Sequence, residues 1–170
     1  MTTTDAPSAP AARAASELEA AVEGMAPRLL ALPPAVRERR PAPGKWSVAE
    51  IVGHLVDSAA NNHQRFVRAR FQDDLVFPGY AQDGWVDAQG YQAAPWEELV
   101  TLWRTYNRHL ARLMRLVPRD VATREHRRHN LHEIAWRTVP ADQPATLEYF
   151  MADYVGHLKH HLAQIEILVR

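Results

Sequence analysis

The chain has 170 residues, of which 46% are hydrophobic and 24% charged, and this size and composition fit one compact domain with a sizeable core. Its 20 basic and 20 acidic residues give a formal net charge of zero, which argues against nucleic acid or an anionic membrane as a partner. The absence of cysteine excludes disulfides, thiolate metal ligands and a cysteine nucleophile, so imidazole, carboxylate or carbonyl groups must hold any metal ion.

The N-terminal segment is rich in Ala, Pro and Thr and lacks helical periodicity. This predicts a flexible tail over residues 1–15 and a single domain over residues 16–170. The segment has no basic region followed by an apolar one, and the chain has no run of about 18 apolar residues. We therefore expect a cytoplasmic protein without a membrane partner.

Two amphipathic helices are predicted in the first half of the chain. Ser16 and Glu19 have the spacing of a capping box for a first helix, which Pro33 ends. A second Ser-x-x-Glu box starts at Ser47, and apolar residues at helical spacing follow it, so a second helix is predicted over residues 47–71.

Two long connections separate the remaining helices. Residues 72–94 contain turn-forming Gly and Pro together with Tyr80, Trp85 and Tyr91, and we expect part of this segment to cover a cleft. Residues 119–144 include an Arg- and His-rich stretch whose role the sequence leaves open.

Two further helices flank the second connection. One is predicted between Pro95 and Pro118, with the clearest amphipathic pattern of the chain. The other begins at a candidate cap, Thr146, and carries apolar residues at helical spacing as far as Val169. Four amphipathic helices without a strand pattern predict an all-α fold, a four-helix bundle.

A histidine pair on the last predicted helix is the strongest functional pattern. His157 and His161 are four residues apart, which stacks their imidazoles on one helical face as a pair of metal ligands would require. Projection at about 100° per residue places His161 within about 50° of the apolar centre and His157 about 90° from it, with His160 roughly opposite. The alternative is that both are half-buried histidines bonded to neighbouring polar groups.

His54 is the candidate third ligand. It lies on the second predicted helix, on a polar line with Ser58, Asn61 and Arg65. That line is either a solvated face or one wall of a wet cleft between helices, where bundles build metal sites. The other histidines have weaker patterns, and a solvated basic patch is the preferred interpretation of the group His126, His129 and His132.

Two motifs together resemble the DinB-like superfamily. The first runs from Lys45-Trp46-Ser47 to His54-Leu55-Val56-Asp57-Ser58, and the second is Tyr154-Val155-Gly156-His157 with His161-Leu162-Ala163-Gln164-Ile165. The resemblance implies an up-up-down-down four-helix bundle with a long crossover, a homodimer, and a metal triad of His54, His157 and His161. The chain has Ala59 where the family often has Glu, so no role of that Glu is carried over.

The resemblance implies a metal-dependent enzyme without fixing its substrate. Family members resemble transferases that use low-molecular-weight thiols, metal-dependent hydrolases and proteins without known activity. We expect one divalent ion, zinc or nickel first and iron or manganese as alternatives, and a small-molecule substrate. A non-catalytic metal- or ligand-binding stress-response module is the other class. Residues expected to bind substrate or orient the ligands are Asp57, Asn61, Tyr80, Trp85, Asp153 and Tyr154.

Overall fold

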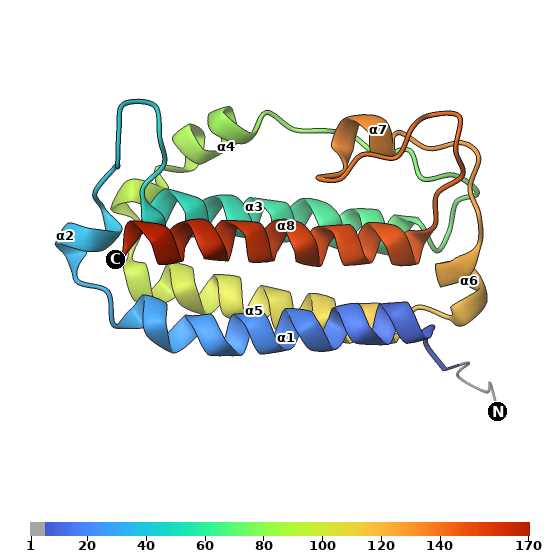
Figure 1. Ribbon diagram of the computed structural model, residues 1–170, viewed down its shortest axis with the longest axis horizontal. Coiled ribbons are helices and arrows are strands. Elements are labelled where there is room, and N and C mark those ends of the chain that lie inside the picture. The colour runs from blue at the N-terminus through green and yellow to red at the C-terminus, as the bar shows by residue number, and fades with distance from the viewer. Residues whose placement is uncertain (1–5) are drawn as a thin grey trace.

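A computed structural model describes residues 6–170, and its regular elements are helices (Figure 1). Four long helices form a bundle: α1 (Ala9–Leu30), α3 (Val48–Arg68), α5 (Trp96–Arg115) and α8 (Leu147–Leu168). Helices α1 and α3 each pack against both α5 and α8, and the apolar faces of all four helices enclose one core. The prediction of an all-α four-helix bundle is confirmed. No helix in the described part combines the length and apolar character of a membrane span.

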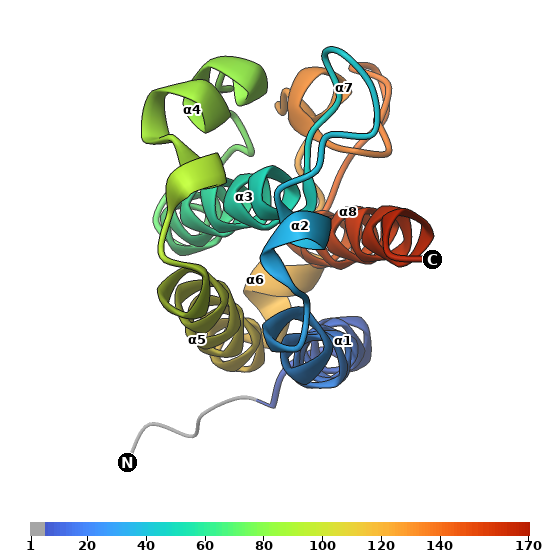
Figure 2. The ribbon, with the colours of Figure 1, turned by 90° about the vertical axis from the view of Figure 1, so that its left-hand side faces the viewer.

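The helices run up, down, down and up, rather than in the up-up-down-down order that the family resemblance implied (Figures 1 and 2). Helices α3 and α5 begin at the same end of the bundle, where Oγ of Ser47 contacts Gln92. Nε1 of Trp96 donates to the carbonyl of Leu29, so α5 begins where α1 ends. The order differs because the connection between α3 and α5 runs back along the whole bundle. Helices α3 and α5 are therefore parallel neighbours.

The caps of α3 and α8 are those that the sequence predicts. The Ser47 side chain accepts from the Glu50 N–H, and the Glu50 carboxylate accepts from the Ser47 N–H at 2.8 Å. The Thr146 hydroxyl accepts from the N–H of Tyr149 at the start of α8. Helix α3 ends at Arg68, close to the predicted boundary.

Helix α1 starts at Ala9, so the predicted flexible tail over residues 1–15 is wrong for its second half. The hydroxyl of Ser8 accepts from the N–H of Ala11, and a proline occupies the first turn, where a missing N–H costs little. Buried alanines pack this first part of the helix, and a search for large apolar residues overlooks them. The predicted cap Ser16 instead donates to the Ala12 carbonyl inside the helix. Residues 1–5 of the predicted tail lie outside the described residues.

Short helices occupy the connections. They are α2 (Pro34–Arg37), α4 (Gln82–Gln89), η1 (Tyr91–Ala93), α6 (Arg119–Thr123) and α7 (Leu131–Ile134). Helices α4 and α7 lie on the outer side of the α3 and α8 pair, opposite α1 and α5 (Figure 2). Both long connections therefore border the groove between α3 and α8.

Gly53 allows η1 to approach α3 closely. A Cβ added at Gly53 would lie 2.1 Å from the ring of Tyr91, a distance that no real contact permits. The Tyr91 hydroxyl reaches past this point and donates to Oδ1 of Asp57 at 2.7 Å. The absence of a side chain at Gly53 thus allows η1, which precedes α5, to pack on the first half of α3.

We predict that Gly53→Ala destabilises the protein by about 1–3 kcal/mol, because the methyl group would overpack against Tyr91. The matched control is Gly24→Ala on the exposed side of α1, where a Cβ meets nothing within 4 Å. This control should gain about 0.5–1 kcal/mol, the usual helical preference for Ala over Gly. Urea unfolding of both variants measures the difference, and equal stability of the two would contradict the packing argument.

Candidate metal centre

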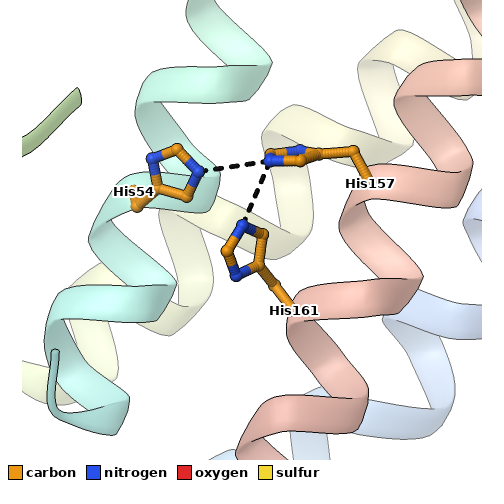
Figure 3. A group of neighbouring side chains, drawn as sticks. All are labelled: His54, His157 and His161. Atoms are coloured by element: carbon orange, nitrogen blue, oxygen red, sulfur yellow. Dashed lines mark hydrogen bonds between the residues drawn. The ribbon is translucent and has the colours of Figure 1, made fainter. Parts of the chain in front are cut away.

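Three imidazoles meet between α3 and α8 (Figure 3). His54 comes from α3, and His157 and His161 come from successive turns of α8. Nε2 of His157 lies 3.3 Å from Nε2 of His54 and 3.1 Å from Nε2 of His161. One ring nitrogen from each residue lies within 4.8 Å of the others. The structure therefore brings together the three histidines that the sequence and the family resemblance pointed to.

Neighbouring oxygens orient two of the rings. Nδ1 of His161 lies 2.8 Å from Oε1 of Gln164, an acceptor that requires the proton on Nδ1. Nδ1 of His157 lies 3.5 Å from the hydroxyl of Ser58. Protons on these Nδ1 atoms leave the Nε2 lone pairs directed at one another, the tautomer that metal-binding histidines adopt. Nδ1 of His54 is buried and has no hydrogen-bond partner among residues 6–170.

A shared cation satisfies this arrangement better than hydrogen bonds do. The Nε2 of an imidazole carries either one hydrogen or one lone pair, so His157 cannot bond both His54 and His161 through that atom. In a tetrahedral site with nitrogens about 2.0–2.1 Å from zinc, two ligand nitrogens lie roughly 3.3 Å apart. The Nε2 separations from His157 to His54 and to His161 are close to that value, and the three ligand nitrogens all lie within 4.8 Å of one another. The donor set therefore fits one divalent ion.

The imidazoles are electrically neutral at physiological pH. Burial, and secondly the positive charge that His161 would carry, lower the pKa of His54 to about 3. Burial and the neighbouring histidines lower the pKa of His157 to about 3 as well, and burial lowers that of His161. Neutral imidazoles are the form that binds metal ions, so no proton competes with the metal at pH 7.

A polar cavity of about 300 Å³ opens beside His157 and His161. Its volume lies at the lower end of the range typical of small-molecule sites. Its wall includes Ser58, Asn62, Arg65, Tyr80, Trp136 and Tyr154. A second cavity of about 410 Å³ lies on the other side of His161 and is largely apolar, with Trp46, Ile51, Ile167 and Leu168 in its wall. The candidate metal centre thus lies between a polar and an apolar cavity.

The six other residues expected at the site divide into two groups. Tyr80, Asp153 and Tyr154 line the polar cavity. Trp85, Asp57 and Asn61 are absent from its wall and from that of the apolar cavity. Trp85 packs on Tyr80 with ring centroids 4.9 Å apart. Asn61 donates back to the Asp57 carbonyl, so its side chain follows α3.

Asp57 and Asp153 position the connections around the site. The Asp57 carboxylate accepts from Gln89 and from Tyr91, which ties α4 and η1 to α3. The Asp153 carboxylate accepts the backbone N–H groups of Trp136 and Arg137 at 2.9 and 2.7 Å. Burial raises the pKa of both carboxyl groups, and these hydrogen bonds counteract it. Asp153 thereby holds Trp136 at the mouth of the polar cavity.

Asn62 and Trp136 belong to the cavity but were missed in the sequence. The polar line on α3 passes through His54, Ser58 and Asn62, each four residues from the last, whereas the sequence projection placed Asn61 on it. A strict four-residue step from His54 would have selected Asn62. Trp136 lies in a long connection without periodicity, so no sequence signal marked it.

The Arg- and His-rich stretch of the second connection has a structural part. The ring of His126 bonds the Asp73 carbonyl, and the ring of His129 bonds the Gln143 carbonyl at 2.7 Å. Both rings are buried, so these two histidines are not in the solvated patch that the sequence suggested. The His126 bond joins the second long connection to the first, whereas the His129 bond lies within the second connection. Within residues 6–170, no other group of three His, Asp or Glu side chains converges as the triad does.

Comparisons with known proteins agree with this fold. A family model described as the DinB superfamily matches residues 13–165. The chain is 28% identical over 128 residues to YfiT of Bacillus subtilis (strain 168), which is named as a candidate metal-dependent hydrolase. This alignment covers 75% of the chain and 66% of the relative, just under two thirds of the relative's length.

A solved structure of YfiT from Bacillus subtilis has a TM-score of 0.75 with this chain at 20% sequence identity. The match covers 92% of the chain and 83% of the solved one, which is described as a candidate metal-dependent hydrolase with an unusual four-helix bundle topology. At this identity the likeness supports the fold.

We predict that replacing His54, His157 or His161 by Ala lowers the bound metal at least tenfold, because each removes one of three ligand nitrogens. His160→Ala and His109→Ala, which remove exposed imidazoles outside the triad, should retain the metal. Elemental analysis of the purified variants measures the ratio of metal to protein. Full metal content in His157→Ala would exclude this triad as the ligand set.

Proposed function

The chain belongs to the DinB superfamily, and on this basis we propose that it is a metal-dependent hydrolase of a small molecule. The observation that carries the proposal is the convergence of three neutral imidazoles beside a polar cavity. The naming of its relative YfiT as a candidate metal-dependent hydrolase supports the same reaction class. Three protein ligands are the number found in catalytic sites, since structural sites use four.

Zinc or nickel is the proposed ion, because three imidazoles suit either and no thiolate is present. When bound by three neutral ligands, such an ion keeps a position open and lowers the pKa of a water or thiol there enough to supply a nucleophile near pH 7. The residues around the site would then have to orient the substrate and stabilise developing charge.

Tyr80 is suited to stabilise negative charge. Burial and the nearby Asp57 carboxylate raise the pKa of its phenol to about 12, so the hydroxyl keeps its proton at pH 7. It lines the polar cavity together with His157. A neutral phenol at this place can donate a hydrogen bond to the oxygen of a substrate carbonyl as charge develops on it.

The walls of the polar cavity limit the access of bulk water. Trp136 packs its ring over the position of Gly156, where an added Cβ would lie 2.9 Å from the indole. Tyr80 and Gln82, from the first long connection, form a further part of the wall. Partial exclusion of water strengthens each hydrogen bond made to the substrate.

Transfer of a low-molecular-weight thiol to an electrophile is the second candidate reaction. The observation that favours it is the pair of cavities on either side of His161. Two reactants could reach the same ion from a polar and an apolar side. A thiol would have to come from outside, because the chain contains no cysteine.

We predict that turnover requires the metal and proceeds without a covalent adduct on the protein. A chelator should abolish activity in a panel of esters, amides and thiol–electrophile pairs, and added zinc or nickel should restore it. His157→Ala should lose activity in parallel with its metal.

Intact mass spectrometry during turnover tests whether the protein becomes covalently modified. A stable substrate adduct on the chain, with activity that survives metal removal, would rule out the proposed mechanism. Product release accompanied by consumption of the thiol would identify the reaction as thiol transfer. Product release without thiol consumption would identify it as hydrolysis.

A further inference from the structure

Arg65 is a buried cation without an anionic partner. Its residue is 6% exposed, and it forms no ion pair with any carboxylate of the described residues. By contrast, several arginines with exposed guanidinium groups bind a carboxylate: Arg28, Arg40, Arg104 and Arg115. Removing a guanidinium from water costs several kcal/mol unless a counter-charge compensates. The charge of Arg65 is therefore compensated neither by a carboxylate of the described residues nor by exposure to water.

The contacts of Arg65 are all with neutral groups. One terminal nitrogen donates to the Pro78 carbonyl at 2.9 Å, and the other lies 3.4 Å from Oδ1 of Asn62. Its guanidinium carbon lies 5.9 Å from the centroid of the Phe150 ring. These contacts hold the side chain in place but leave its positive charge available. Burial lowers the pKa of Arg65, which is the physical sign of an uncompensated charge.

Arg65 lies on the same wall of the polar cavity as the side chains that lead to the triad. Ser58 contacts His157, Asn62 contacts Ser58, and Asn62 in turn contacts Arg65. Ser58 and Arg65 are seven positions apart, so their backbone positions are separated by about 10 Å along the axis of α3. The cavity therefore has the imidazoles toward one end and a cation toward the other.

We propose that Arg65 binds a carboxylate of the substrate, an inference that rests on the proposed function and specifies its substrate class. The substrate is a small monoanion whose reacting bond lies at the triad and whose carboxylate lies at Arg65 in the same cavity. A guanidinium matches a carboxylate in geometry and charge. A single Arg neutralises one negative charge, and the carboxylates of Glu133 and Asp153 in the same wall disfavour a dianion such as phosphate.

A purely structural role is the competing explanation. The bond to the Pro78 carbonyl could by itself fix the segment that carries Tyr80. The two explanations differ in what they require of a ligand. Only the proposed role makes the affinity for a small molecule depend on both the ligand's negative charge and the arginine.

The test measures binding to chelator-treated full-length protein, so that no metal can bind the carboxylate. Isothermal titration compares hexanoate with its neutral isostere hexanamide and with inorganic phosphate. Hexanoate should bind at least tenfold more tightly than either, because hexanamide brings no negative charge to the guanidinium and dianionic phosphate brings a second charge that Glu133 and Asp153 repel.

Arg65→Gln should remove this preference and leave hexanamide binding unchanged. Arg65→Lys should retain part of it, since the charge stays but the planar fork is lost. The control is Arg68→Gln on the exposed side of α3, which should bind hexanoate as the wild type does. Circular dichroism checks that each variant is folded. If Arg65→Gln does not fold, the proposal is judged from the preference of the wild type for hexanoate over hexanamide and from the reduction of that preference in Arg65→Lys.

Equal binding of hexanoate and hexanamide to the wild type would overturn the proposal, as would unaltered hexanoate binding in Arg65→Gln. Tighter binding of phosphate than of hexanoate would overturn the carboxylate assignment. These outcomes are independent of the hydrolase proposal, because metal-dependent turnover is measured separately and without reference to the charge of the substrate.

Discussion

The mutual approach of three buried imidazoles is the constraint on which the site depends. Burial keeps His54 and His157 neutral, so each ring retains one nitrogen lone pair that is free to bind a metal ion. With protons on Nδ1 of His157 and His161, the Nε2 lone pairs of these two rings face each other at 3.1 Å and repel in the absence of a cation. The packing of α3 on α8 holds the His54 ring beside them. A divalent ion would convert this local repulsion into a bond between the two helices, and binding would then stabilise the fold.

The long connections serve this pair of helices rather than the bundle as a whole. One buried carboxylate on each helix binds one connection: Asp57 of α3 holds η1, and Asp153 of α8 holds the segment before Trp136. A glycine lies close to each histidine motif where a ring must come near the helix, Gly53 beneath Tyr91 and Gly156 beneath Trp136. Each side of the groove thus has a buried carboxylate that binds a connection and a glycine that lets an aromatic ring approach the helix. They explain how irregular segments can form fixed walls for a cavity.

The chemical character of the cavity follows from which helix face lines it. Helix α3 contributes a line of polar side chains at steps of about one turn, and this line ends at a buried guanidinium. The apolar cavity on the opposite side of His161 has a different composition, with Trp46 and Ile51 in its wall. An ion held between them would meet reactants of different polarity from different sides. This is why the geometry supports hydrolysis first and also accommodates a two-substrate transfer.

Local patterns in the sequence determined the four helices, the caps at Ser47 and Thr146, and the pairing of His157 with His161, because helical periodicity and capping depend on neighbours within a few residues. The third histidine came from the resemblance of two motifs, since projection left the polar face of α3 open to either water or a cleft. Only the tertiary structure decided that this face lines a cavity and that Asp57 and Asp153 anchor connections. It also decided the helix directions. Each of these depends on contacts between residues far apart in the chain, and burial by distant residues leaves no local periodicity to read.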